Sequence, residues 1–195
     1  MSDKIEVPYS NGYYYPPSPR PQIAEVLKLK HSGTVLDIGA GFGNNLPPLL
    51  EHDFHIVATE TNPDCLIGLN KLADEHPGRI KVMGAALETL AFTVQFDVIL
   101  CTMVLHFLDP ADARAAISNM QKWTKPDGIN VITGYTANNP IEQLQEHGVK
   151  FLLETNELRS KYDGWKILSY EEERGTSKNA LGVAFESARL IAQKT

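Results

Sequence analysis

A glycine-rich run with an aspartate and, separately, a glutamate each stand at the end of a short apolar stretch of the sequence. The run Asp37-Ile-Gly-Ala-Gly-Phe-Gly43 follows a short apolar stretch, and Glu60 ends the next one. Glycines let the backbone pass close to a ligand, and the N–H groups that open a following helix are available to bind it. A carboxylate at the end of a second strand can accept both hydroxyl groups of a ribose. The pairing predicts a cofactor that contains an adenosyl group.

The elements that would position these residues alternate between strands and helices. Near-continuous apolar strands predict a parallel sheet covered on both faces, and the right-handed crossover rule makes it doubly wound. The predicted strands are 35–38, 55–59, 79–83, 96–101 and 129–133, and the predicted helices are 22–30, 44/45–50, 62–73 and 109–123. In such a sheet a ligand binds at the carboxyl ends of the strands, where both motifs stand.

The alternation stops after residue 133. A polar stretch and a short helix near 154–162 are expected next, followed by strands at 165–172 and 182–192. The linker 174–179 is rich in turn-forming residues and predicts a hairpin loop. The predicted fold class is therefore α/β: a Rossmann-like, doubly wound and mostly parallel sheet of seven strands that ends in an antiparallel hairpin, with helices on both faces.

The length of 195 residues favours a single domain. We expect residues 1–33 to form an N-terminal arm and a short helix, 34–133 the cofactor-binding core, 134–162 a substrate-side insertion and 163–195 the terminal hairpin. The arm is rich in tyrosine and in proline, which excludes a regular helix or a central strand. Two interpretations stay open: an extended arm that lies on the domain, and a lid whose aromatic side chains close over a ligand.

The balance of charge argues against polyanionic partners. The chain has 18 Lys and Arg against 24 Asp and Glu, a net charge of −6, and acidic chains are poor generic binders of nucleic acid or anionic membranes. No apolar run approaches the roughly 20 residues of a membrane span. The two cysteines lack metal-ligand spacing and fit a reducing compartment. We expect a cytoplasmic monomer or homodimer that acts on a small molecule, with no metal, nucleic acid or membrane partner.

The spacing of the glycines separates two kinds of adenosyl cofactor. A dinucleotide fingerprint, G-x-G-x-x-G, would need a glycine where Asn44 stands. The pattern D-x-G-x-G-x-G over 37–43 instead resembles motif I of class I S-adenosylmethionine-dependent methyltransferases. The terminal hairpin and the turn at 125–128 before the fifth strand are similar to that family as well. The resemblance implies S-adenosyl-L-methionine as the cofactor and S-adenosyl-L-homocysteine as its product.

The same resemblance implies roles for individual residues. Asp37 would order the loop that holds the methionine part, and Glu60 would hold the ribose. After the third strand, Ala86 stands where many members carry an aspartate, and Glu88 is a weaker substitute for it. The full set of cofactor-binding residues implied by the resemblance is Asp37, Gly39, Ala40, Gly41, Glu60, Thr61, Ala86, Leu87, Cys101, Thr102 and Met103.

Longer segments resemble one branch of these enzymes, the TehB-type tellurite-resistance methyltransferases. These segments are 96–108, 118–126 and, most specifically, 156–165, which is similar to the family's G-E-L-R-x-x-Y-x-G-W sequence. The resemblance covers most of the chain from Gly33 onward. Three parts differ from the family. Its aromatic G-F-P-F-x-F loop reads Gly-Val-Lys-Phe-Leu-Leu over 148–153, and the histidine of its N-E-D-x-G-E-L-H sequence has no counterpart in 171–176. Asp127 also replaces the first of two glycines.

Two residues are expected to act on the substrate. His106 follows the fourth strand and could face the acceptor, with a packed histidine at a helix start as the alternative. An anionic acceptor needs a cationic clamp, for which Arg159 is the first candidate and Arg20, Lys150 and Arg174 are the next.

The predicted function is methyl transfer from S-adenosyl-L-methionine to a small molecule, with a metalloid oxyanion such as tellurite as one acceptor. A soft nucleophile of this kind needs no strong general base, and none is obvious in the sequence. The alternatives are methyl transfer to another small organic or thiol acceptor, and a methyltransferase-like protein that binds the cofactor without turnover. A nicotinamide-dependent oxidoreductase is a more distant alternative.

Overall fold

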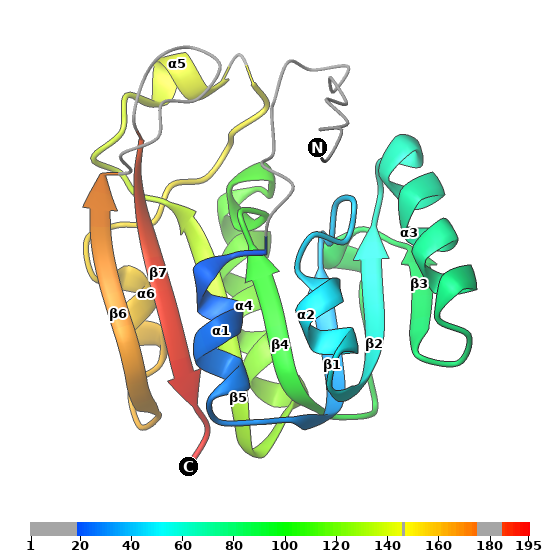
Figure 1. Cartoon of the computed structure of the whole chain (residues 1–195). Helices are drawn as coiled ribbons and strands as arrows, with labels where there is room; N and C mark the ends of the chain where they lie inside the picture. The colour runs from blue at the N-terminus through cyan, green and yellow to red at the C-terminus, as the bar shows by residue number, and fades with distance from the viewer. Residues whose placement is uncertain (1–18, 146, 175–184) are drawn as a thin grey trace, which may run out of the picture.

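Seven strands of the described chain form one mixed sheet. The computed structural model describes residues 19–145, 147–174 and 185–195. The strands are β1 (Ser32–Ile38), β2 (Asp53–Glu60), β3 (Ile80–Gly84), β4 (Phe96–Thr102), β5 (Thr124–Tyr135), β6 (Lys166–Arg174) and β7 (Glu186–Gln193), in the order β3-β2-β1-β4-β5-β7-β6. β1 to β5 run parallel, whereas β7 is antiparallel to both β5 and β6. In Figure 1, β2 and β4 point to the same upper edge of the sheet.

The order of the strands changes direction beside β1. The chain builds outward from β1 through β2 to β3, then crosses back to place β4 and β5 on the other side of β1. Asp37, near the carboxyl end of β1, is paired with Ala58 of β2 and with Leu100 of β4. The carboxyl end of β1 is therefore the topological switch point at which sheets of this kind bind ligands.

Helices cover both faces of the sheet. α1 (Pro21–Leu27), α2 (Leu46–Leu50) and α3 (Pro63–Glu75) pack on one face, and α4 (Pro110–Trp123) and α6 (Glu157–Lys161) pack on the other. In Figure 1, α1 and α2 lie in front of the strands and α4 lies behind them. The short 3-10 turns η1 (Leu87–Thr89) and η2 (Leu105–Phe107) follow β3 and β4, and α5 (Ile141–Gln145) follows β5.

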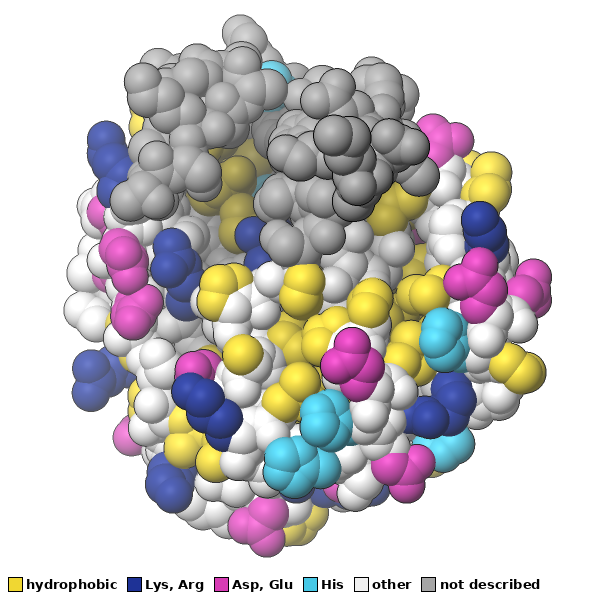
Figure 2. All heavy atoms as spheres, in the orientation of Figure 1, with side chains coloured by type: hydrophobic (Ala, Val, Ile, Leu, Met, Phe, Trp, Pro, Cys, Tyr) yellow, Lys and Arg dark blue, Asp and Glu magenta, His cyan; other side chains and the backbone are white. Residues whose placement is uncertain are grey.

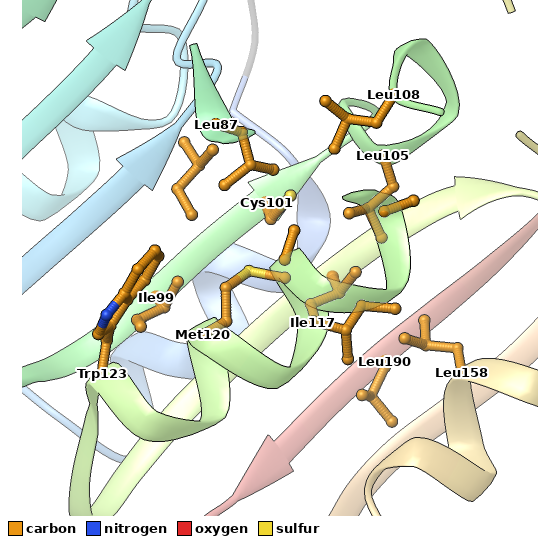
Figure 3. Packing of buried hydrophobic residues seen from close by; sticks show 14 of the residues in the cluster. Leu87, Ile99, Cys101, Leu105, Leu108, Ile117, Met120, Trp123, Leu158 and Leu190 are labelled. Carbon is orange, nitrogen blue, oxygen red and sulfur yellow. The ribbon is translucent and has the colours of Figure 1, made fainter. Parts of the chain in front are cut away.

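Each face has its own hydrophobic cluster. The α4-side cluster includes Ile99, Ile117 and Met120, and the α1-side cluster includes Ile23 and Leu100. In α4, Ile117 and Met120 are fully buried and stand three residues apart on one side of the helix. Figure 3 shows both directed toward the strands. Ile99 and Leu100 are consecutive residues of β4, so the two clusters share the same strands.

The predicted fold class is confirmed, although several bounds move by a few residues. The fifth strand begins at Thr124 rather than at residue 129, because residues 125–128 kink inside the strand instead of forming a separate turn. Asp127 has a φ of 59° there, and the pairing with β4 jumps from Phe96 with Thr124 to Val98 with Ile129.

Three expectations differ from the described chain or lie outside it. The five-residue helix α5 lies in the expected polar stretch, where no helix was named. Residues 1–18 lie outside the described residues, so both interpretations of the arm stay predictions. Most of the expected hairpin loop lies in 175–184, which is also outside them, although the antiparallel pairing of β6 with β7 is confirmed.

The face that carries α1 and α2 is mixed in charge. Figure 2 shows acidic and basic side chains interspersed on this face rather than gathered into one patch of a single sign. Separately, none of the described helices is both long enough and apolar enough to cross a membrane.

Candidate functional site

A pocket of about 470 Å³ opens at the carboxyl edge of the sheet. Its volume lies in the range typical of sites for small molecules and cofactors. The loops that follow β1, β2, β3 and β4 line it, together with the segment that leads into α1. The described lining residues are Pro19, Arg20, Pro21, Ile38, Gly39, Ala40, Gly41, Phe42, Asn44, Asn45, Thr59, Glu60, Thr61, Asn62, Cys65, Ala85, Ala86, Leu87, Glu88, Thr102, Met103, Val104, Phe107 and Leu108.

The glycine-rich loop after β1 brings backbone to the pocket. Gly39 and Gly41 have φ angles of 63° and 58°, in the left-handed region that favours glycine. A Cβ on Gly39 would stand 2.4 Å from Cγ2 of Val104, so this glycine permits the loop to pack against the segment after β4. A Cβ on Gly41 would meet nothing within 4 Å. A ligand can therefore approach the backbone closely at Gly41.

Glu60 ends β2 and faces the glycine-rich loop. Its Oε2 accepts a hydrogen bond from the backbone N–H of Gly41 at 2.8 Å. Its Oε1 accepts from the N–H of Thr61 at 2.7 Å and from that of Asn62 at 2.9 Å. A carboxylate offers about four acceptor positions, so one further donor can be accommodated without breaking these bonds. The structure thus brings together the two motifs predicted from the sequence.

Asp37 lies beneath the pocket, in the centre of the sheet. Its side chain is fully buried, and neither carboxyl oxygen has a hydrogen-bond partner among the described residues. Burial raises the pKa of Asp37 to about 7, with a further rise from the charge of Glu60 and an opposing effect of the Asn45 side chain. Cys101 is also fully buried, and burial followed by the charge of Asp37 raises the pKa of its thiol. Cys101 is therefore a protonated, packed side chain.

Asn45 connects three parts of the site. Its Oδ1 accepts a hydrogen bond from the backbone N–H of Arg20 at 3.1 Å, and its Nδ2 donates to Oγ1 of Thr102 at 3.5 Å. Asn45 itself is buried, at the N-cap position of α2. It therefore ties the segment before α1 and the carboxyl end of β4 to the start of α2, above Asp37.

His106 lies outside the described lining of the pocket. Its side chain is buried, and its ring centroid lies 4.2 Å from that of Phe107 and 4.6 Å from that of Tyr135. Burial lowers the pKa of His106 to about 3, so the imidazole is neutral at physiological pH. Its carbonyl oxygen accepts from the N–H groups of Lys150 at 2.7 Å and Phe151 at 3.2 Å. In this position His106 anchors the segment 148–153.

Arg159 lies on a different surface from the pocket. It lines a shallow depression formed by residues of 156–167. Its guanidinium carbon stands 5.9 Å from the centroid of the Tyr170 ring. Arg159 is absent from the described residues that line the carboxyl-edge pocket, and so are Lys150 and Arg174. Among the four cations considered as clamps, the structure brings only Arg20 to this pocket.

The segment 156–165, which carries the most specific sequence resemblance, makes packing contacts around α6. Oε1 of Glu157 accepts from Nε of Arg114 at 2.6 Å, which links α6 to α4. Tyr162 is fully buried, and its hydroxyl accepts from Nδ2 of Asn130 in β5 at 2.8 Å. The ring of Trp165 meets that of Tyr162 edge to face, with centroids 4.9 Å apart. These residues hold α6 against α4 and the sheet.

Most of the expected cofactor residues line the pocket. Those that do are Gly39, Ala40, Gly41, Glu60, Thr61, Ala86, Leu87, Thr102 and Met103. Asp37 and Cys101 lie beneath it, whereas His106 and Arg159 lie outside it. The first group could be found from the sequence because each of these residues closely follows the end of a predicted strand, where ligands of parallel sheets bind.

Several lining residues were not singled out from the sequence. Val104, Phe107 and Leu108 follow β4, and Asn62 and Cys65 follow β2. A search that continued a few residues further past each predicted strand end would have found these five. Asn45 was considered only as one possible start of the predicted helix 44/45–50. Arg20 was named as a candidate clamp, but nothing in the local sequence indicates that Pro19 and Pro21 reach the pocket, because α1 brings them there by packing on the sheet.

One family model matches most of this chain, and curated relatives match it as well. The family model described as tellurite resistance protein TehB matches residues 8–181. A Haemophilus influenzae (strain 10810) protein named "Probable S-adenosyl-L-methionine-dependent methyltransferase TehB" is 25% identical over 178 residues, which cover 88% of this chain and 61% of that protein. Hemagglutinin 1 of Eikenella corrodens is 28% identical over 178 residues, covering 88% of this chain and 58% of its own length. This chain spans about three fifths of these relatives.

Solved structures support the same fold. The crystal structure of TehB from Haemophilus influenzae matches with a TM-score of 0.78 and 22% identity, covering 90% of this chain and 62% of that chain. The N-methyltransferase NodS from Bradyrhizobium japonicum, in complex with S-adenosyl-L-homocysteine, matches with a TM-score of 0.69 and 16% identity over 89% of this chain and 84% of its own. At these identities the likeness establishes the fold.

Proposed function

The chain belongs to the family of tellurite resistance protein TehB, and on that premise we propose that it transfers a methyl group from S-adenosyl-L-methionine to a small molecule. The observation that carries the proposal is the junction of the glycine-rich loop with Glu60. Both line a pocket of about 470 Å³ at the topological switch point of the sheet. A carboxylate and an open glycine backbone at this place suit the ribose and the amino acid part of such a cofactor.

The residues of the pocket fit this cofactor at several points. Glu60 has an acceptor position left for a ribose hydroxyl, beyond the three backbone bonds that it already accepts. Gly41 leaves open space where a Cβ would stand. Ala86 and Leu87 provide an apolar wall and backbone groups for the adenine. When bound, S-adenosyl-L-methionine supplies a methyl group that its sulfonium makes electrophilic.

The chain's own part in the reaction is to position the reactants and exclude water. Val104, Phe107 and Leu108 place apolar side chains along the pocket after β4. The buried His106 is neutral and does not line the pocket, and no histidine or lysine is found among the described lining residues. We therefore infer an acceptor that is already a nucleophile, such as a reduced metalloid oxyanion or a thiolate. Tellurite is the first acceptor to test, because the family is described by tellurite resistance.

A second acceptor class is favoured by the segment 148–153. Phe151 is its one aromatic residue, and it is buried in the α4-side cluster with the guanidinium carbon of Arg114 5.0 Å from its ring centroid. It therefore serves packing and leaves the pocket without an aromatic cover from this segment. That arrangement leaves room for a second class of acceptor, another small organic molecule or a thiol. A cofactor-binding protein without turnover is the remaining alternative.

The test is the release of S-adenosyl-L-homocysteine from S-adenosyl-L-methionine at saturating cofactor, with and without tellurite. Tellurite-dependent release is the expected result and would establish the acceptor as well as the activity. Release with a panel of small thiols but not with tellurite would support the second acceptor class. Binding of S-adenosyl-L-homocysteine without release for any acceptor would favour the binding protein, and failure to bind it would contradict the proposal.

Two matched variants test the residues that carry the proposal. Glu60→Gln and Glu88→Gln each remove one negative charge from the same pocket. Hydrogen bonds to a charged group contribute about 1.5–3 kcal/mol, so we expect Glu60→Gln to weaken S-adenosyl-L-homocysteine about 10- to 100-fold. Glu88→Gln, at the weaker substitute for the family's aspartate, should cost less affinity than Glu60→Gln. Equal losses in both variants would indicate a general effect of charge rather than a ribose contact at Glu60.

A further inference from the structure

The segment that leads into α1 is a rigid wall of the pocket. Prolines stand on both sides of Arg20 and fix their own φ angles, while Arg20 itself has a φ of −62° and a ψ of 140°. Its carbonyl oxygen accepts from the N–H of Ile23 at 2.9 Å, and its N–H donates to Oδ1 of Asn45 at 3.1 Å. The backbone of Arg20 is therefore held in place before a ligand binds.

α1 keeps this wall against the sheet. Ile23 and Val26 of α1 are almost completely buried in the α1-side cluster, together with Leu46 and Leu49 of α2. The partner of the Arg20 backbone, Asn45, precedes α2 directly. Packing of the two helices thus sets the place from which the Arg20 side chain extends. Little conformational entropy remains to be lost in the backbone when that side chain binds a ligand.

The charges of the pocket make Arg20 distinctive. Among the described lining residues it is the one lysine or arginine, whereas Glu60 and Glu88 are both acidic and Asp37 lies beneath the floor. Two carboxylates suit the hydroxyl and ammonium groups of a ligand. They repel any carboxylate or oxyanion, which loses water on entering a pocket and then needs a charged partner. Arginine meets that need with a planar fork of N–H groups.

The position of Arg20 separates it from the ribose side of the pocket. Its backbone bonds to Asn45, whose side chain reaches Thr102 at the carboxyl end of β4. Glu60 belongs to β2, which lies on the opposite side of β1 from β4. The backbone of Arg20 is therefore tied to the β1–β4 side of the pocket, away from the end of β2 that carries Glu60.

We propose that Arg20 is the oxyanion-binding residue of this pocket. The inference rests on the proposed function and names the part of the ligand that this side chain recognises. Two sources can supply the oxyanion: the α-carboxylate of the cofactor's methionine part, and an anionic acceptor such as tellurite. In this assignment the clamp is Arg20 rather than Arg159, which lies on another surface.

The test compares two ligands that differ in the amino acid part. S-adenosyl-L-homocysteine carries the α-carboxylate, and 5′-methylthioadenosine keeps the nucleoside and the sulfur but lacks it. For Arg20→Gln, calorimetry should show about a 10- to 100-fold loss of affinity for the first ligand. Affinity for the second should stay within about twofold. Arg20→Lys should recover part of the loss, because it keeps the charge without the bidentate fork.

Controls separate this inference from the proposed function. Lys28→Gln removes an exposed cation at the end of α1, outside the described lining, and should change neither affinity. Thermal unfolding of each variant shows whether the fold is kept. If the wild-type chain does not bind S-adenosyl-L-homocysteine, the proposed function fails and the ligand named for Arg20 fails with it.

The acceptor arm uses tellurite at saturating S-adenosyl-L-methionine. A rise of about tenfold or more in the KM for tellurite in Arg20→Gln, with both nucleoside affinities unchanged, would identify the acceptor as the source of the oxyanion. The proposal is overturned if Arg20→Gln folds normally and leaves the affinity for S-adenosyl-L-homocysteine and the KM for tellurite within about twofold. It is also overturned if both nucleoside ligands lose affinity equally, because that result indicates a change in the pocket as a whole.

Discussion

At the residue scale, Asp37 combines a central position with an environment that disfavours its charge. It is fully buried between β2 and β4, and its oxygens have no hydrogen-bond partner within the described chain. Burial is the main reason that its pKa rises to about 7, and the charge of Glu60 adds to the rise. Such a side chain binds a proton in the folded protein over a range of pH in which the unfolded chain has already released it.

Asp37→Asn is therefore expected to remove a pH-dependent destabilisation. The folded-state pKa of about 7 exceeds the unfolded value of 3.8. The contribution of Asp37 to the unfolding free energy of the ligand-free wild type is therefore fully present below about pH 4. This contribution is lost as the pH rises toward 7. This difference in pKa corresponds to roughly 4 kcal/mol. Relative to wild type, Asp37→Asn should gain a few kcal/mol in unfolding free energy between pH 5 and pH 8 in chemical denaturation.

Asp97→Asn is a matched control of opposite sign. Burial alone would raise the pKa of Asp97, but hydrogen bonds from Lys125 and Thr34 outweigh it, so the pKa lies below 3.8. This carboxylate contributes stability above the unfolded pKa, and the contribution is lost as the pH falls through the folded pKa. Asp97→Asn should therefore be less stable than wild type at both pH 5 and pH 8. A difference between wild type and Asp37→Asn that stays constant over this range would contradict the role given to Asp37.

The sequence predicts which residues gather at this site better than how each one is held there. Spacing alone places Asp37 and Glu60 near the ends of neighbouring strands, because strand periodicity and parallel order are local properties. The burial of Asp37 depends on β4 closing over β1, which is a contact across more than 60 residues of sequence. Likewise, Arg159 stands in the best-matched segment, yet its direction is set by the packing of Tyr170 in β6.

At the element scale, the segment after β5 is fastened to the start of β7. Asn139 is buried, and its Nδ2 donates to the carbonyl oxygens of Thr136 at 2.9 Å and Glu186 at 2.7 Å. Its Oδ1 accepts from the N–H of Glu186 at 2.7 Å. The amide side chain thus pairs with the backbone much as a neighbouring strand would. It fixes the exit of the chain from the sheet toward α5.

Asn139→Ala should loosen this connection more than Asn138→Ala. Loss of the buried amide removes the partner of the Glu186 N–H, whereas the carbonyls of Thr136 and Glu186 keep backbone donors. The unpaired N–H costs about 1–3 kcal/mol of unfolding free energy. Asn138 is exposed and donates one bond, to Oε1 of Glu186 at 2.7 Å. Its replacement should cost less than about 0.5 kcal/mol. Urea denaturation of the two variants measures both values, and equal costs would show that burial of Asn139 is not decisive.

The elements also show where sequence patterns stop being informative. The longer strands and α3 and α4 follow from apolar runs and from proline at the first helical position. α5 has only five residues, too few for a helical period to stand out. The kink at 125–128 is hidden for another reason. A proline, an aspartate and a glycine in succession are typical of a turn, and only the pairing of Thr124 with Phe96 makes them part of a strand.

At the scale of the whole molecule, the pocket joins segments that are far apart in sequence. Its walls come from residues 19–21, from the ends of β1 and β2, from η1 and from the segment after β4. The parallel sheet collects the strand ends, and α1 adds the first segment through the α1-side cluster. A ligand bound in this pocket would therefore bridge parts of the chain that both clusters hold in position.

This arrangement predicts one cooperative unfolding transition that a ligand shifts as a whole. Ile99 and Leu100 of β4 belong to opposite clusters, so neither cluster can separate without breaking the strand that both share. Tryptophan fluorescence reports on Trp123 and Trp165, which both pack in or against the α4-side cluster. Circular dichroism and fluorescence should therefore give the same midpoint. S-adenosyl-L-homocysteine at 100 times its Kd adds about 2.7 kcal/mol, so both midpoints should rise together by about 5–10 °C. Two separate transitions, or a shift seen by one probe alone, would show that the two faces unfold independently and that residues 1–195 do not form the single domain predicted from their length.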